Sequence, residues 1–185
     1  NSTTSAGVTV TLSKGTQSTL TAISTPSSLT YGATSTLSSS GGSGTGTVTF
    51  SAGSSTGCSV SGTVLSVTDA SGTCTVTATK AADTNYNSTT SAGVTVTLSL
   101  QTVTVTVAST TKVFGVSDPT FTYTSSDNAV IFTGSLSRAA GETVGTYAIT
   151  QGTLSAGANY SIIFVSANLT IVATTSKFVI IDQGT

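Results

Sequence analysis

A 13-residue sequence that occurs twice in the chain is the strongest constraint on its fold. NSTTSAGVTVTLS begins at Asn1 and again at Asn87, so the two copies are offset by 86 residues (87 − 1). A match of this length is too long for chance even in a Thr-rich sequence, and it indicates a duplicated structural unit. The residues that follow the two copies differ, so we interpret the repeat as the closing strand of a module. Residues 1–13 are then expected to close a preceding module.

Between the two copies, residues 14–99 show short runs in which Val, Leu and Ala alternate with Thr and Ser. Alternation with period two predicts antiparallel strands that are buried on one face. Gly-rich segments such as 41–44 supply turns. Seven short strands are typical of an Ig-like β-sandwich, which we predict for residues 14–99. The expected strands are 19–24, 34–38, 47–52, 58–61, 63–68, 72–80 and 94–98.

Residues 100–173 form a second module that is also predicted to be mainly β. No segment shows a convincing helical period, although residues 136–142 have room for one helical turn. The tail 174–185 is interpreted as the start of a following module, with a strand over 176–182. The fold class predicted for the chain is therefore all-β, in tandem modules. The expected strands of the second module are 102–107, 121–124, 130–132, 147–150, 160–165 and 169–172.

Charge and composition argue against several functional classes. The formal net charge is −1, from five basic and six acidic residues that never form a block, so no nucleic acid or anionic membrane is expected as a partner. No apolar stretch approaches the roughly 20 residues that span a bilayer, so no membrane insertion by this segment is expected. The absence of His removes the commonest general base and metal ligand. We expect no catalytic residue, no cofactor and no metal site.

The two cysteines, Cys58 and Cys74, enclose 15 residues that are expected to form a strand, a turn and a strand. The hydroxyl-rich, charge-poor surroundings are typical of extracellular proteins, in which such a pair forms a disulfide. That bond would stabilise the module by about 3 kcal/mol in the chain-entropy treatment. The alternative is a pair of reduced, buried thiols. A metal site is not expected, because no His or third Cys completes the coordination.

Few charged residues are candidates for a site. Arg138 and Glu142 are a close opposite-charge pair around a turn, and we interpret them as a structural pair that ties residues 135–147 to the sheet. Asp118 precedes Pro119 and either shapes a turn or contributes one ligand to a cation. A calcium site needs several clustered oxygens, whereas the aspartates are scattered. Isopeptide crosslinks to Asn or Asp are a further alternative for three lysines, Lys80, Lys112 and Lys177.

Residues 112–171 contain KVFGVSDPTFTYT, then TGSLSRAAGETVGTYAITQGTLSAGANYSIIF, then NLTI. This stretch resembles the MBG (mostly β-grasp) modules of large bacterial surface adhesins. It departs from the pattern at Phe114, where these modules commonly carry Tyr, and at residues 127–129, where an acidic-Gly pair is common. The positions that carry the resemblance are Gly115, Asp118, Pro119, Gly134, Leu136, Arg138, Gly141, Glu142, Gly145, Tyr147, Gly152, Leu154, Asn159 and Tyr160.

The first module looks like the bacterial Ig-like repeats that accompany MBG modules, through GTVTFSAGSSTGCSVSGTVLSVTDASGTCTVTATKAADTNYN. These resemblances imply a secreted or cell-surface bacterial protein with tandem modules. The expected function is a non-catalytic stalk, spacer or extracellular filament component. Its partners would be neighbouring modules of the same chain, other copies in a filament or an unknown surface ligand. The alternative is an adhesin module that recognises a glycan or protein through its loops.

Overall fold

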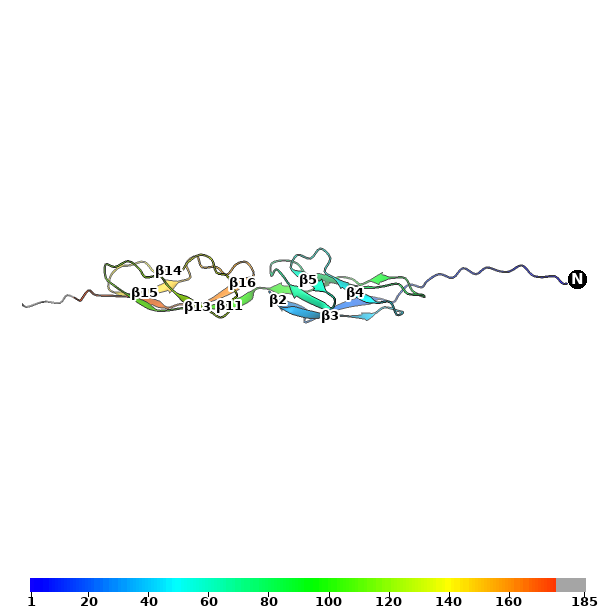
Figure 1. Cartoon of the computed structure of the whole chain (residues 1–185), viewed down its shortest axis with the longest axis horizontal. Coiled ribbons are helices and arrows are strands. Elements are labelled where there is room, and N and C mark those ends of the chain that lie inside the picture. Colours follow the sequence, from blue (N-terminus) through cyan, green and yellow to red (C-terminus); the bar gives the residue numbers. More distant parts are fainter. Residues whose placement is uncertain (176–185) are drawn as a thin grey trace, which may run out of the picture. The chain divides into compact units, whose positions relative to one another are not determined.

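The computed structural model describes residues 1–175, and no helix occurs in that part of the chain. The chain divides into two compact units, Asn1–Leu100 and a second unit that begins at Gln101 (Figure 1). Both units are built from strands, which confirms the predicted all-β class. Residues 1–175 therefore contain no helix that is long and apolar enough to cross a membrane.

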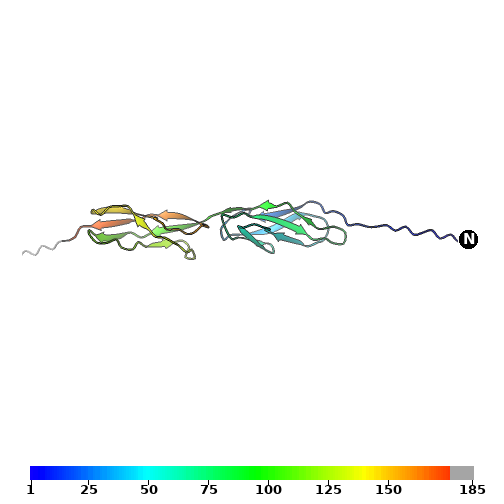
Figure 2. The same cartoon turned by 90° about the horizontal axis from the view of Figure 1, so that it is seen from above.

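Two sheets and a short parallel pair make up the first unit, and Figure 2 shows the same strands from above. One sheet has the order β1-β3-β6-β5, the other has β4-β7-β8 with β9 also on β7, and β2 pairs with β10. Their bounds are β1 Leu20–Thr25, β2 Ser28–Thr30, β3 Thr34–Gly41, β4 Val48–Ser51, β5 Cys58–Ser61, β6 Val64–Val67, β7 Thr75–Lys80, β8 Thr89–Thr90, β9 Val94–Thr95 and β10 Thr97–Ser99.

Alternation explains why these residues form two facing layers. In β1 the residues are buried and exposed in turn, which places Leu20 and Ala22 inside. The main core cluster joins Leu37 and Leu65 of one sheet to Val76 of the other. Because the apolar faces of both sheets meet in one cluster, the first unit is a β-sandwich.

The seven strands expected in 14–99 are present, but the last of them differs in detail. The expected strand 94–98 is divided into β9, which ends at Thr95, and β10, which begins at Thr97, because the segment changes its pairing partner from β7 to β2 around Val96. Two short strands, β2 and β8, were not predicted. Residues 1–13, which are expected to close a preceding module, pair with no described strand, and that expectation stays a prediction. Pairing starts only at Gly15, which bridges Tyr86.

Within residues 101–175, the second unit has one three-stranded and one four-stranded sheet. Their orders are β13-β11-β16 and β12-β17-β15-β14. The cores lie around Val103 and around Val107, Ile149 and Leu169. The strand bounds are β11 Gln101–Val107, β12 Thr110–Val113, β13 Tyr123–Ser125, β14 Ser137–Arg138, β15 Gly145–Thr150, β16 Tyr160–Val165 and β17 Asn168–Val172.

Two parallel pairings in this unit share one register. β11 pairs with β16 from Gln101↔Tyr160, and β12 pairs with β17 from Thr110↔Leu169. Both offsets are 59 residues (160 − 101 and 169 − 110). The segments 101–113 and 160–172 therefore run side by side from the three-stranded sheet into the four-stranded sheet. In the four-stranded sheet, β12 is an edge strand.

Two expectations for the second module are wrong, and one strand was missed. The helical turn over 136–142 is wrong, because Ser137 and Arg138 form β14 and pair with β15. Residues 130–132 do not form a strand: Val130 packs in a core cluster, and the nearest pairing is the isolated bridge from Thr133 to Ser155. β12 was not predicted. Residues 174–175 form no strand, and the strand expected over 176–182 lies outside the described residues.

Candidate functional site

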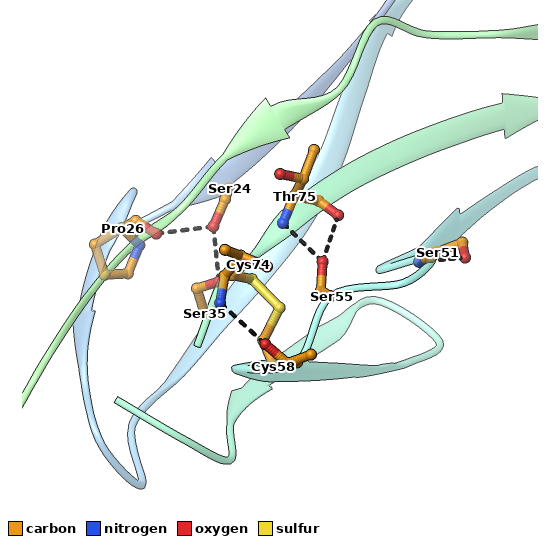
Figure 3. The surroundings of a disulfide bond; sticks show 11 residues. Ser24, Pro26, Ser35, Ser51, Ser55, Cys58, Cys74 and Thr75 are labelled. Carbon is orange, nitrogen blue, oxygen red and sulfur yellow. Dashed lines mark hydrogen bonds between the residues drawn. A yellow bond between two sulfur atoms is a disulfide. The ribbon is translucent and has the colours of Figure 1, made fainter. Parts of the chain in front are cut away.

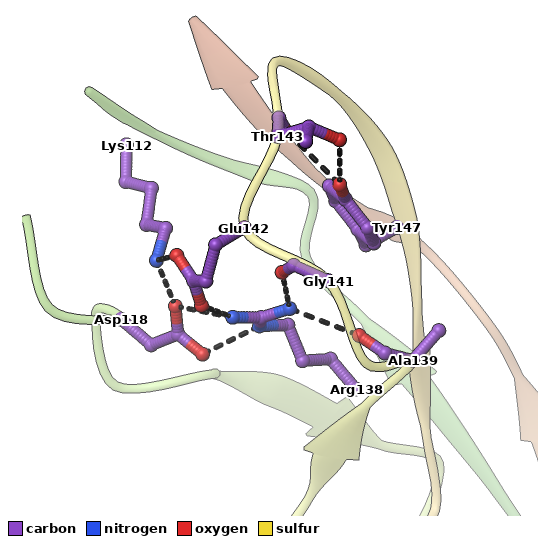
Figure 4. A network of polar contacts seen from close by, with 8 residues as sticks. All are labelled: Lys112, Asp118, Arg138, Ala139, Gly141, Glu142, Thr143 and Tyr147. Carbon is purple, nitrogen blue, oxygen red and sulfur yellow. Dashed lines mark hydrogen bonds and ion pairs between the residues drawn. The ribbon is translucent and has the colours of Figure 1, made fainter. Parts of the chain in front are cut away.

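Four charged side chains of the second unit meet in one cluster (Figure 4). The cluster consists of Lys112, Asp118, Arg138 and Glu142, and we call it the charge cluster. Residues 101–175 contain only one other charged residue, Asp127. In so charge-poor a chain, this concentration makes the charge cluster the first candidate for a functional site.

The two cations of the charge cluster lie on opposite edges of one sheet. Lys112 belongs to β12 and Arg138 to β14, which are the outer strands in the order β12-β17-β15-β14. Three strand spacings separate these edges, about 14 Å. The two carboxylates come from loops, Asp118 after β12 and Glu142 between β14 and β15. The loops therefore carry the anions that connect the two edge strands.

Lys112 is the buried member of the cluster, with its side chain 3% exposed. It occupies the inward position of β12, and its Nζ donates to Asp118 Oδ1 at 2.6 Å and to Glu142 Oε2 at 2.7 Å. A buried ammonium group is tolerated only when it is paired in this way. The hydrogen bonds to Asp118 and then to Glu142 raise the pKa of Lys112 above its usual range, although burial opposes the shift.

Arg138 holds the other side of the cluster through its planar guanidinium group. Nε donates to Asp118 Oδ2 at 2.5 Å and Nη2 donates to Asp118 Oδ1 at 3.1 Å, which is a two-bond fork on one carboxylate. Nη2 also pairs with Glu142. Nη1 donates to the main-chain carbonyls of Ala139 and Gly141, at 2.9 and 2.5 Å. One side chain thus anchors three points of the β14–β15 loop and the loop after β12.

Tyr147 of β15 contacts the same loop (Figure 4). The guanidinium of Arg138 lies 5.4 Å from the centre of its ring, within cation–π range. Its hydroxyl donates to the carbonyl oxygen of Thr143 at 2.9 Å. Gly141 has a φ of 137°, and a Cβ there would lie 2.3 Å from Cε1 of Tyr147. Only glycine allows the loop to approach the ring this closely.

Mutual pairing keeps every member of the charge cluster ionised at neutral pH. The Arg138 and Lys112 hydrogen bonds lower the pKa of Asp118 from 3.8 to about 2. The pKa of Glu142 is lowered as well, mainly by Lys112. A general acid or base needs a pKa near the working pH, and these shifts move each group away from it. The geometry is therefore suited to holding chain segments together.

The same charge state bears on the isopeptide alternative. The structure brings Lys112 and Asp118 into contact, with Glu142 beside them. An amide between Lys112 and Asp118 would form by attack of the neutral lysine amine on the carboxyl carbon of the aspartate, with loss of water. Here the pKa of the amine is raised and that of the carboxyl is lowered, so both reacting groups are held in the unreactive form. The contact is an ion pair.

An open surface depression lies beside the charge cluster. Lys112, Asp118 and Glu142 form its polar side, and Phe114 and Val116 form its apolar side. Phe114 is 49% exposed and Val116 is 55% exposed. An exposed aromatic ring next to paired charges is the kind of surface on which a polar ligand can stack.

The disulfide expected between Cys58 and Cys74 is present (Figure 3). Their Cα atoms are 5.5 Å apart, which lies in the usual range for such bonds. Cys58 begins β5 of one sheet, and Cys74 directly precedes β7 of the other. Both are buried, and beside them the hydroxyls of Ser24 and Ser35 satisfy each other at 2.8 Å. The bond joins the two layers of the sandwich, and the alternative of two free thiols is wrong.

The other aspartates of the described chain organise turns. Asp69 accepts from the main-chain nitrogen of Ser71 at 2.9 Å. Asp83 accepts from the nitrogens of Thr45, Asn85 and Tyr86, at 2.7 to 2.8 Å. These bonds lower the pKa of both carboxyls. Within residues 1–175, no group of three or more His, Cys, Asp or Glu is placed to hold a metal ion.

The sequence paired Arg138 with Glu142 and identified Asp118 on its own, and the structure unites the three around Lys112. Arg138 and Glu142 are in contact, as the structural pair requires, but each also pairs with a residue outside that pair. Sequence reasoning missed the role of Lys112 because it missed β12. The available signal was a lysine followed six residues later by an Asp-Pro turn.

Comparison with known proteins identifies the second unit. Searches of the curated proteins and of the solved structures found no match. The family model described as MBG domain (YGX type) matches residues 103–170, a range that contains all four members of the charge cluster. MBG domains are repeats of bacterial surface proteins, and the disulfide in the first unit agrees with an extracellular location. Residues 103–170 of this chain are therefore similar to MBG domains of the YGX type.

Proposed function

We propose that this chain is a non-catalytic structural segment of a bacterial surface protein, in which an Ig-like module and an MBG module act as a stalk or spacer. The observation that carries the proposal is the use of the charged and sulfur-bearing side chains. In the first unit the two cysteines join the sheets, and in the second the charge cluster joins the sheet edges. Side chains that other proteins use for chemistry serve here as cross-links.

A spacer must keep its modules folded when its ends are pulled apart. Cross-links between segments distant in sequence suit this role, because they must break before the chain can extend. The disulfide also shields 15 enclosed residues from extension. The partners of such a segment are neighbouring modules of the same chain, and its place is the bacterial surface.

Single-molecule pulling of the full chain tests the proposal. We expect two separate unfolding events, one for each unit. Adding reductant should lengthen the extension of one event by about 55 Å, from the 16-residue Cys58–Cys74 separation at roughly 3.5 Å per residue. A chain that extends without resolvable unfolding events would contradict a role as a stalk or spacer.

A second candidate function is ligand recognition through the depression next to the charge cluster. The exposed ring of Phe114 beside Lys112 and Asp118 favours it. Glycan-array and cell-binding measurements on the full chain decide between the two. A pure spacer gives no saturable binding. Saturable binding that is lost in Phe114→Ala and kept in Val64→Ala, a change at a similarly exposed apolar residue of the first unit, would establish a binding module instead.

A further inference from the structure

Within residues 101–175, β16 is a long strand at an open edge of a sheet (Figure 1). The order β13-β11-β16 gives it β11 as a neighbour on one side and no strand on the other. Its six residues, YSIIFV, include no charged residue, no Pro and no Gly. A long, uncharged, apolar edge strand is a template for pairing with a further strand.

The main chain of β16 has unpaired groups at this edge. Gln101 N donates to Asn159 O where the parallel ladder with β11 begins. Alternate residues of a strand direct their main-chain groups to opposite sides, so the odd-numbered residues of β16 face β11. Ile162 and Phe164 therefore turn theirs to the open edge, where no other residue of 1–175 forms a hydrogen bond with them. The N–H and C=O groups of both residues are available to a partner strand.

The side chains of β16 are incompletely covered as well. None of the six is fully buried, although five are apolar or aromatic. On the outer face Ile163 is 52% exposed and Val165 is 44% exposed. On the inner face Ile162 and Phe164 are only half-buried, whereas three of the seven residues of the adjacent β11 are buried. A strand added beside β16 would cover apolar surface on both faces.

The other sheet edges of the second unit are protected against such pairing. β12 has the buried Lys112 at its inward position, and β14 is two residues long and contains Arg138. β13 is three residues long. Short strands and inward-pointing charges are known devices that prevent edge-to-edge pairing. β16 has neither of these devices, so it is the edge at which this unit can accept a strand.

The chemistry of this edge favours a second copy of the chain as the partner. The three strands of the sheet contain no charged residue, so two copies can meet edge to edge without repulsion between like charges. Two β16 strands related by a two-fold axis pair antiparallel. One register places Ile162 opposite Phe164 of the other copy, and this register pairs the main-chain groups that each copy leaves free. It also places Ile163 opposite its own counterpart on the axis.

We propose that β16 is a self-association edge, through which two copies of this chain join their three-stranded sheets into one sheet of six strands. Main-chain bonds between Ile162 and Phe164 and contact between the two Ile163 side chains provide the association. The paired edge is short, so the association is weak for free chains and gains strength where many copies are anchored close together. The proposal goes beyond the proposed function and does not rest on it, because a spacer can be single or paired.

Sedimentation velocity of the full chain, over a concentration series up to about 1 mM, tests the association. Wild type should form reversible dimers. Ile163→Lys places two ammonium groups opposite each other and should weaken dimerisation roughly 10-fold or more. Val64→Lys, the same charge at a similarly exposed residue of the first unit, should dimerise like wild type. Monomeric wild type throughout the series, or equal weakening by the two changes, would overturn the proposal.

If Ile163→Lys does not fold, Ile163→Thr replaces it, because Thr keeps the strand propensity and removes the apolar contact on the axis. It should also weaken dimerisation relative to wild type. Association of folded Ile163→Thr that equals that of wild type would then count against the proposal.

Cysteine cross-linking tests the register independently. Ile163→Cys should give a disulfide-linked dimer under mild oxidation, because opposite residues of a non-hydrogen-bonded pair have Cα atoms about 4.5 Å apart. Val165→Cys is the matched control on the same strand. In this register it faces Ser161 of the other copy and lies about 13 Å along the strand from its own counterpart, so it should stay monomeric. Mass spectrometry without reductant measures both, and cross-linking of both variants to the same extent, or of neither, would contradict the proposal.

Discussion

The two units solve the same problem with different chemistry. Each holds a small β core in a chain of which only 6% is charged. The first unit joins its two sheets with the Cys58–Cys74 bond, and the second joins the two edges of one sheet with the charge cluster. One cross-link responds to redox conditions, and the other responds to pH. The difference shows that each unit's stability can be perturbed separately.

Breaking the disulfide should have the largest effect. Replacing both cysteines by serine should lower the free energy of unfolding of the first unit by about 3 kcal/mol, because the unfolded loop regains its freedom. The second unit should be unchanged. Chemical denaturation followed separately in each unit measures this. Intact mass with and without reductant, differing by two hydrogens, verifies the bond. An equal loss in both units would contradict separate cross-links.

Removing the buried cation of the charge cluster should have the second-largest effect on stability. Lys112→Met keeps the buried stem but leaves Asp118 and Glu142 with Arg138 as their only cation, so the denaturation midpoint of the second unit should fall. Lys14→Met, a change at an exposed lysine of the first unit, is the control and should have little effect. Similar shifts for the two variants would show that Lys112 is not a structural link.

Alanine substitutions at two glycines separate the cost of a steric clash from the cost of an unfavourable backbone conformation. Gly115→Ala places a side chain at a φ of 84° with no atom nearby, and should cost about 1 to 2 kcal/mol for the conformation alone. Gly141→Ala adds a clash with Tyr147 and should cost more. Thermal unfolding of the second unit measures both. If Gly141→Ala is the milder change, the loop does not rely on the ring contact.

The pH dependence should give the smallest effect and still distinguish the units. The pKa of Asp118 is lowered, so its contribution is present above pH 3.8 and is lost as the pH falls towards about 2. Asp69 and Asp83 give the first unit an acid loss of the same sign. The pKa of Lys112 is raised, so its contribution is present below pH 10.5 and is lost as the pH rises through the raised value.

Unfolding of the second unit at a series of alkaline pH values tests this sign. Wild type should lose stability above pH 10.5, and Lys112→Met should lose less over the same range. Identical alkaline profiles would mean that another group causes the loss.

Much of the fold was predictable because it depends on local alternation. The strand at 160–165 was predicted with the bounds that β16 has, and Cys58 and Cys74 were identified as a bonded pair. Local sequence signals failed where the structure of a segment depends on its pairing strand or its counterions. The segment around Arg138 contains helix-forming residues but pairs with β15. β12 was missed because its inward residue is a lysine, whose counterions are brought to it only by the topology.

The repeat gives the clearest physical reason for these limits. Residues 1–13 and 87–99 are identical, yet the first segment is exposed and unpaired and the second closes a sandwich. Strand formation therefore depends on whether a partner edge is present, which strand propensity alone does not contain. The charge cluster is a similar case, because residues 112, 118, 138 and 142 meet only after both sheet edges are in place.

Hydrogen exchange of the full chain, resolved by peptide, tests the claim of two independent cross-links most directly. With reductant, amide protection should fall in residues 15–100 and stay unchanged in 101–175, and in Lys112→Met the pattern should reverse. Loss of protection in both units under either change, or in neither, would contradict the account.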